Sequence, residues 1–261
     1  MKLLVSYISQ RFKPLQFLVL ACLLSLLINY PSMEIDYWLN SIGFLFASFF
    51  AFRFLDDVFS VHIDRIEHPE RQYLSVKNYV TFVVICACVL PIYLIALFYF
   101  EWPWPYIGSI ILLIIISVIL YTIFGKKPNV LMLISLLKYP VLLGAFIDFP
   151  ESFLPQIIAS FFIVLAYDLA EDIHRNKSTF WWLLVVELIC GLLLFHHLTL
   201  TLFLLFLIAP IIQTVLAHFF SPAKANAVGN KLQLSGYRYL HIQLIFYYPI
   251  TYYVFTYFST L

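Results

Sequence analysis

Long apolar stretches, separated by short polar segments, follow one another along nearly the whole chain. A helix needs roughly 20 mostly apolar residues to cross the hydrocarbon core of a membrane, where no water satisfies the backbone. The pattern therefore predicts membrane-spanning α-helices. Nine spans are predicted, at residues 14–30, 37–55, 78–100, 104–124, 129–148, 153–168, 180–198, 199–220 and 238–259.

Lys and Arg are distributed unevenly between the loops on the two sides. With nine spans, every loop on the side of the N-terminus contains basic residues, whereas the opposite loops contain acids such as Glu101 and no Lys or Arg. Positively charged loops stay in the cytoplasm. We therefore expect an integral protein of the bacterial inner membrane, with its N-terminus in the cytoplasm and its C-terminus outside.

The overall composition agrees with this class of protein. The 261 residues are 63% hydrophobic and 11% charged, whereas soluble domains carry about 25% charged residues. The chain contains no internal repeat and no linker. We expect residues 1–261 to form a single domain, an all-α integral membrane bundle.

Acidic residues are concentrated at two places on the cytoplasmic side. These places hold eight of the 14 acids: Asp56, Asp57, Asp64, Glu67 and Glu70 after the second span, and Asp168, Glu171 and Asp172 after the sixth. Asp57 and Asp64 are two helical turns apart and Asp168 and Asp172 one turn, so each pair shares a helix face. Two such faces, opposed at the mouth of a bundle, would form a carboxylate cluster whose repulsion a multivalent cation relieves. Mg²⁺ prefers carboxylates together with substrate phosphates.

Basic residues lie on the same side as these acids, namely Arg65, Arg71, Lys126, Lys127, Arg175 and Lys177. A phosphate substrate bridged to the acids by Mg²⁺ would need such cations to neutralise its remaining charge. Membrane topology alone is an equally good explanation of each one. Lys138 and Glu187 lie within predicted spans, where charges are costly and usually face the interior. Lys138 and Arg53 are therefore candidates to contact either a substrate or a structural carboxylate.

Three stretches resemble motifs of the UbiA superfamily of membrane prenyltransferases. "DDVFSVHIDRIEHPER" resembles the first aspartate-rich motif of that family, and "YDLAEDIHRNKST" resembles the second. Between them, "LYTIFGKKPNV" is similar to the family's tyrosine followed by a basic pair. The motifs occur in the family's order, after the second, fourth and sixth spans. The resemblance implies a nine-helix bundle whose central cavity opens to the cytoplasmic side and holds an isoprenyl diphosphate.

The resemblance also implies roles for single residues. Asp56 takes the Asn/Asp place of the family's first motif. The two aspartate-rich motifs together imply Mg²⁺ as the cofactor, bound by Asp56, Asp57, Asp64, Asp168 and Asp172. Arg71, Tyr121, Lys126, Lys127 and Lys177 match the family's diphosphate-contacting positions. Arg65 and Lys138 are added as expected diphosphate contacts because of their places in the sequence, beside the acids and within a span. Two positions depart from the pattern, because Ser60 stands where the middle aspartate is expected and Gln72 where proline usually follows the arginine. Ser60 leaves one carboxylate fewer on that helix face.

The implied activity is a Mg²⁺-dependent prenyl transfer. The isoprenyl diphosphate ionises, basic residues stabilise the departing diphosphate, and a small aromatic or lipid-like acceptor attacks the allylic carbocation. The Asp57, Asp64, Asp168 and Asp172 carboxylates are the expected catalytic groups. Isoprenyl diphosphate, membrane lipid and an unidentified acceptor are the expected partners, and no nucleic acid is expected.

Several alternatives remain open. A related terpene cyclase or diphosphate lyase would ionise the same substrate without an external acceptor. A transporter or Mg²⁺ channel is less favoured, because its charges would lie near the bilayer midplane and its sequence would show repeats. A CDP-alcohol phosphotransferase is disfavoured because its Asp-Gly-x-x-Ala-Arg signature is missing. A protein that keeps the fold but has lost catalysis is also compatible with Ser60.

Overall fold

A computed structural model describes residues 4, 7, 8, 12–28, 35–67, 72–124, 128–146, 153–172, 177–196, 198–220 and 240–259. Every regular element within these ranges is a helix, and no strand occurs among them. The predicted all-α class is therefore confirmed for the described residues. The chain divides into two compact units, each described here by itself: unit 1 is Met1–Ser25 with Glu34–Asp148, and unit 2 is Leu26–Met33 with Phe149–Leu261. The single domain stays a prediction.

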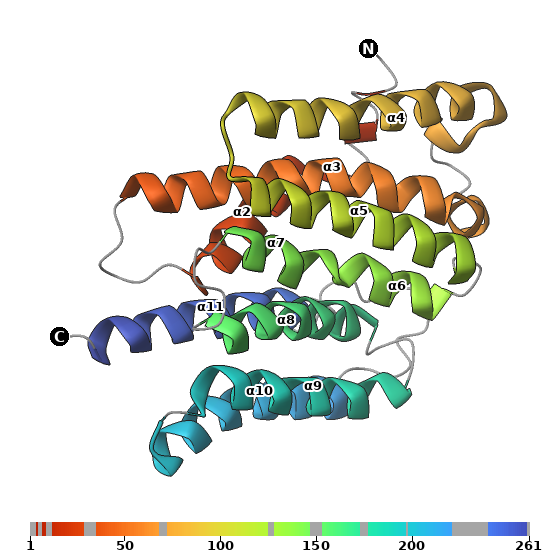
Figure 1. The fold of residues 1–261 in the computed structure, drawn as a ribbon. Coiled ribbons are helices and arrows are strands. Elements are labelled where there is room, and N and C mark those ends of the chain that lie inside the picture. The colour runs from red at the N-terminus through yellow and green to blue at the C-terminus, as the bar shows by residue number, and fades with distance from the viewer. Residues whose placement is uncertain are drawn as a thin grey trace. The chain divides into compact units, whose positions relative to one another are not determined.

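Unit 1 is built around one long helix. Its elements are α2 (Pro14–Ser25), α3 (Ile35–Glu67), η2 (Gln72–Leu74), α4 (Val76–Tyr99), α5 (Trp104–Phe124), α6 (Pro128–Leu136) and α7 (Lys138–Phe146). Helix α3 packs against α2, α4, α6 and α7, while α5 packs against α4, α6 and α7 (Figure 1). The described first acidic motif therefore lies on the helix that makes most of the contacts in unit 1.

Helix α3 is longer than the sequence predicts. It begins at Ile35 and continues to Glu67, well beyond the predicted end of the span at residue 55. The acidic stretch up to Glu67 therefore continues the same helix and does not form a loop. As a result Asp57, Ser60 and Asp64 follow one another at single-turn intervals on one helix.

The predicted span at 129–148 is two helices instead of one. Helix α6 ends at Leu136 and α7 begins at Lys138, with a turn at Leu137. Pro140 explains the break, since a proline has no N–H to donate to a carbonyl one turn earlier. As the third residue of α7, Pro140 lies where backbone N–H groups need no partner within the helix. The break places Lys138 at the first position of α7.

The connection between α4 and α5 is closed by a Schellman motif. Glu101 has φ 55°, its N–H donates to the Phe98 carbonyl at 3.1 Å, and the Trp102 N–H donates to the Leu97 carbonyl at 3.0 Å. The Trp102 ring then packs on Phe44 of α3, with 4.8 Å between the ring centroids. This contact fixes the α4–α5 hairpin against α3.

Unit 2 consists of four long helices and a short N-terminal contribution. The helices are α8 (Leu154–Asp172), α9 (Lys177–Phe195), α10 (Leu200–Phe220) and α11 (Leu240–Ser259). Helix α8 packs against α9 and α11, and α10 also packs against both α9 and α11. At Gly191 a Cβ atom would lie 2.7 Å from the Leu207 Cδ1 atom, so a larger residue there would require the Leu207 side chain to move. Helix α8 extends past the predicted end at 168 and includes both aspartates of the second motif.

Each of the nine predicted segments is mainly helical in its described residues, with 129–148 divided into two helices, but nine membrane crossings stay a prediction. Among the described residues, Asn78–Tyr99 and Trp104–Phe124 are long and apolar enough to cross a membrane. Five shorter apolar segments of 10–17 residues also occur, for example Thr179–Phe195 and Leu200–Leu216. Only 22% and 28% of the most apolar parts of the two long helices are buried inside the protein. A core helix of a soluble protein would be mostly buried.

Candidate functional site

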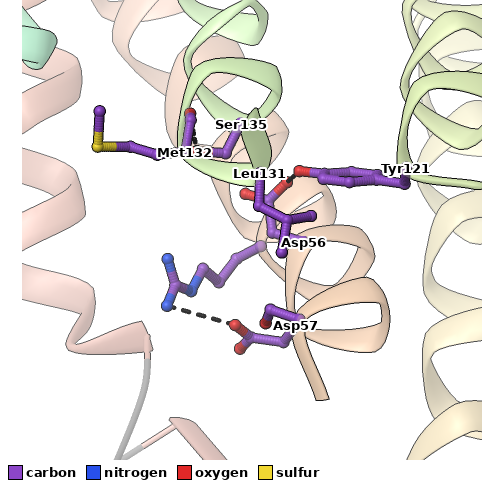
Figure 2. Close-up of a pocket in the computed structure, with 8 residues that line it drawn as sticks. Asp56, Asp57, Tyr121, Leu131, Met132 and Ser135 are labelled. Carbon is purple, nitrogen blue, oxygen red and sulfur yellow. Dashed lines mark hydrogen bonds and ion pairs between the residues drawn. The ribbon is translucent and has the colours of Figure 1, made fainter. Parts of the chain in front are cut away.

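A pocket of about 170 Å³ lies in unit 1 beside the first acidic motif. Its lining comes from three helices: Arg53, Asp56, Asp57 and Ser60 of α3, Tyr121 of α5, and Leu131, Met132 and Ser135 of α6 (Figure 2). The α3 wall is charged, whereas the α6 wall is mainly apolar. Pockets that enclose drug-sized ligands measure about 300–1,000 Å³, so this one suits a polar head group and not a whole prenyl lipid.

Two residues that are distant in sequence meet the Asp56 carboxylate. The Tyr121 hydroxyl donates to Asp56 Oδ1 at 2.6 Å, and Lys138 Nζ forms an ion pair with Asp56 Oδ2. Asp56 and Lys138 are both buried. The three side chains come from α3, α5 and α7, so the packing of these helices creates the contact. Figure 2 shows Tyr121 reaching Asp56 from the neighbouring helix.

Asp57 has a different pair of partners. Arg53 lies one turn earlier on α3, and its Nη2 is 3.3 Å from Asp57 Oδ1. The Tyr7 hydroxyl donates to Asp57 Oδ2 at 2.7 Å. Asp57 is fully buried and Tyr7 nearly so. Burial and the neighbouring Asp57 carboxylate together raise the pKa of the Tyr7 phenol well above its usual value, so Tyr7 stays protonated and remains a donor.

Aromatic packing fixes the tyrosines that reach these aspartates. The Tyr7 ring stacks on Phe54 with 4.5 Å between centroids and makes an edge contact with Tyr73 at 5.4 Å. The Tyr73 hydroxyl in turn donates to Asp64 Oδ2 at 3.2 Å. Ser60 donates to the same oxygen at 3.3 Å. Ser60 thus both lines the pocket and contacts Asp64. It lies on the helix face that the spacing predicts.

The local charge differs from what the sequence suggests. The sequence argument assigns relief of the repulsion to a multivalent cation and leaves Arg53 and Lys138 as contacts of either a substrate or a carboxylate; in the structure each pairs with one pocket aspartate. The four charged groups sum to zero, so their repulsion is relieved within the protein. In the part of the chain that the structure describes, no group of three His, Cys, Asp or Glu side chains is arranged to hold a metal ion.

The pocket nevertheless suits Mg²⁺ in one particular mode. Mg²⁺ is usually bound through one or two carboxylates plus substrate phosphates, and Asp56 and Asp57 both line this pocket. Each of their oxygens already accepts one contact from the protein, but a carboxylate oxygen has a second lone pair available for a metal. The residues therefore fit Mg²⁺ when a phosphate-bearing ligand supplies the remaining oxygens.

The other predicted site residues lie elsewhere or outside the described residues. Arg65 is exposed on α3, with its guanidinium carbon 4.7 Å from the centre of the Tyr79 ring, and it does not line the pocket. Asp168 is half-buried on α8. Arg71, Lys126 and Lys127 lie outside the described residues, as do the side chains of Asp172 and Lys177. The second acidic motif belongs to unit 2 and the first to unit 1, so the predicted opposition of the two faces stays a prediction.

Sequence reasoning missed the two tyrosines that hold Asp57 and Asp64. Tyr7 precedes its partner by 50 residues, and nothing distinguishes it from the other 17 of the 18 tyrosines. Tyr73 also carries no motif, although it lies in the short segment just after the first acidic stretch. The pairing of Arg53 with Asp57, in contrast, can be predicted from the sequence, because opposite charges four residues apart are neighbours on a helix.

No protein-family model, curated protein or solved structure matches the chain. The likeness to the UbiA superfamily therefore rests on the three motifs.

Proposed function

We propose that this chain is a Mg²⁺-dependent membrane prenyltransferase of the UbiA type, which cleaves an isoprenyl diphosphate and transfers the prenyl group to a small acceptor. One observation carries the proposal. Tyr121 and Lys138, both expected on the substrate side, contact the same carboxylate, Asp56, beside a pocket that also contains Asp57. Three residues that the resemblance assigns to metal or diphosphate, Asp56, Asp57 and Tyr121, thus line one pocket in unit 1.

The proposed setting is a membrane crossed nine times, with the N-terminus in the cytoplasm and the C-terminus outside. Large apolar side chains that face outward support a lipid environment, since soluble monomers rarely expose extended apolar surfaces. On α4 these include Val80, Ile92 and Ile95, each more than 60% exposed. Trp181 and Trp182 are exposed near the start of α9, as is typical of aromatic residues at a membrane interface.

Arg53 supplies the proposed contact to the diphosphate. Its Nη2 is engaged with Asp57, but no acceptor among the described residues lies within hydrogen-bonding distance of its buried Nε. The guanidinium has five N–H donors and Arg53 lines the pocket, so donors beyond the one that faces Asp57 can serve a ligand there. A phosphate oxygen is a strong acceptor for arginine. Arg53 is therefore an additional proposed binding residue, beyond those that the motifs assign.

The chemistry follows from these positions. The allylic C–O bond breaks and its electron pair leaves with the diphosphate, after which the nucleophile of the acceptor bonds to the prenyl carbon and releases a proton. When bound, Mg²⁺ supplies positive charge for the departing diphosphate. Tyr121 orients Asp56, and Arg53 donates to the phosphate oxygens. Leu131 and Met132 keep water away from one wall of the pocket.

The proposal is tested by diphosphate release from allylic prenyl diphosphates of several chain lengths, with purified protein in detergent and Mg²⁺. Asp57→Asn should reduce release by about two orders of magnitude, because the carboxylate that faces the head group loses its charge. Asp36→Asn is the matched control, since Asp36 is exposed in the first turn of the same helix. Release that is equal in the two variants, or absent with every substrate, would contradict the proposal. Analysis of the organic products then separates transfer from cyclisation or elimination.

A further inference from the structure

The ion pair between Lys138 and Asp56 is notable for where it lies. Both residues are buried, the pair connects α7 to α3, and Asp56 lines the pocket. The Lys138 ammonium also lies 5.4 Å from the centre of the Tyr139 ring, a distance at which a cation is attracted to the ring face. Lys138 is thus held beside the carboxylate by its own surroundings.

The charge balance of the pocket determines what it can accept. Asp56 and Asp57 contribute two negative charges, and Lys138 and Arg53 two positive charges. A divalent cation alone would add two uncompensated charges beside side chains whose described charges already sum to zero and of which Asp56, Asp57 and Lys138 are buried, which is costly. A diphosphate alone would carry uncompensated negative charge into the same place. Together they largely cancel, so each ligand removes the main cost of binding the other.

We propose that Lys138 is an internal counter-cation that makes metal binding conditional: while it neutralises Asp56, a divalent cation binds only together with a diphosphate-bearing ligand. The inference rests on the proposed function and concerns the same pocket. It assigns to Lys138 a role different from a simple diphosphate contact. By linkage, metal and diphosphate must strengthen each other's binding by the same factor, for which coupling in proteins typically amounts to about 5–150-fold.

Arg53 is not an internal counter-cation in the same sense as Lys138. It lies on the same helix as Asp57, one turn away, and keeps a buried N–H without an acceptor among the described residues. Because Arg53 lines the pocket and its guanidinium has five N–H donors, it can remain with Asp57 and still donate to a ligand. The described ion-pair partner of Lys138 is Asp56, which lines the pocket, so the positive charge of Lys138 neutralises that carboxylate. Removal of Lys138 should expose the Asp56 charge to a metal ion.

Equilibrium dialysis of the purified full chain with Mn²⁺ and inorganic diphosphate tests this inference. A chamber without protein corrects for the Mn²⁺–diphosphate complex in solution. The wild-type protein should retain little Mn²⁺ alone, and diphosphate should tighten Mn²⁺ binding at least about tenfold. Lys138→Met should bind Mn²⁺ without diphosphate at least about tenfold more tightly than the wild type. Lys138→Arg keeps the charge and should behave like the wild type.

Lys13→Met is the control for a general loss of positive charge, because Lys13 is exposed in unit 1. It should leave Mn²⁺ binding unchanged. Wild-type protein that binds Mn²⁺ alone as tightly as with diphosphate would overturn the role of Lys138 and leave the proposed function standing; this comparison needs no variant to fold. Wild-type protein that retains neither Mn²⁺ nor diphosphate under any condition would overturn the proposed function as well.

Discussion

The buried acids of the two units have very different surroundings. In unit 1, Asp56 and Asp57 each contact one cation and one tyrosine hydroxyl. In unit 2, Glu187 on α9 is fully buried, and its Oε1 accepts a hydrogen bond from the Thr214 hydroxyl of α10. Its other oxygen, Oε2, has no hydrogen-bond partner among the described residues. These acids are therefore all buried, but only those of unit 1 have a compensating cation among the described residues.

The presence or absence of a cation beside the buried acid distinguishes a candidate functional site from an acid that only joins two helices. A buried charge is tolerated when it is paired and hydrogen-bonded, as at Asp56 and Asp57, and is costly otherwise. Glu187 contacts neutral groups, so we expect its carboxyl to be uncharged and to join α9 to α10. A charged residue inside a predicted span is often taken as functional. This comparison adds that an acid with its own cation, beside a pocket, is the stronger indication.

The largest effect is expected for Lys138→Met. This variant leaves Asp56 as a buried charge without its ion-pair partner, which should lower the free energy of unfolding by about 3–5 kcal/mol. The measurement is reversible unfolding in detergent micelles, followed by circular dichroism. The double variant Asp56→Asn with Lys138→Met should recover most of the loss, because no uncompensated charge remains. A double variant no more stable than Lys138→Met would show that the two charges are not coupled.

A smaller effect is expected for Tyr7→Phe, which removes the hydroxyl that donates to Asp57. A hydrogen bond to a charged group contributes about 1.5–3 kcal/mol, and we expect a loss of stability in that range. Because the pKa of Tyr7 is raised in the folded protein, the contribution is fully present below pH about 10 and is lost only as the pH rises further. Tyr99→Phe, at an exposed position at the end of α4, is the control and should change stability by less than about 0.5 kcal/mol. Equal effects of the two substitutions would exclude the hydrogen bond as the cause.

The smallest effect is expected for Glu187→Gln. Glutamine keeps an oxygen that can accept from Thr214 and carries no charge, so stability should change by less than about 1 kcal/mol. Asp57→Asn, which removes the charge facing Arg53, should cost more in the same unfolding measurement. Comparable losses for the two amide variants would show that Glu187 is ionised, and the contrast between the units would then fail.

The sequence predicted the helices better than their contacts. Apolar runs located α2 to α5 and α8 to α11. They predicted α6 and α7 as one helix, because the hydrophobic run continues across the break before Lys138, for which Pro140 was an available signal. Single-turn spacing correctly put Ser60 on the face that leads from Asp57 to Asp64. Within one helix, spacing alone decides which side chains are neighbours.

Contacts between helices were beyond such reasoning. Tyr121 and Lys138 were expected near a ligand, yet their shared contact with Asp56 depends on how α7 packs against both α3 and α5. Tyr7 had no signal, because aromatic packing against Phe54 rather than any motif brings it to Asp57. The balance of charge in the pocket follows from these contacts, so it could not be read from the acidic motif.

Thermal unfolding of the purified protein with a prenyl diphosphate, in the presence of Mg²⁺ or of EDTA, tests the central claim most directly. A ligand that binds only the folded state raises its stability by about 2.7 kcal/mol at 100 times its dissociation constant. The account predicts a higher melting temperature only when prenyl diphosphate and Mg²⁺ are present together, and loss of the gain on addition of EDTA. Equal stabilisation in EDTA, or none with Mg²⁺, would contradict the claim that the unit 1 pocket binds a metal-bridged prenyl diphosphate.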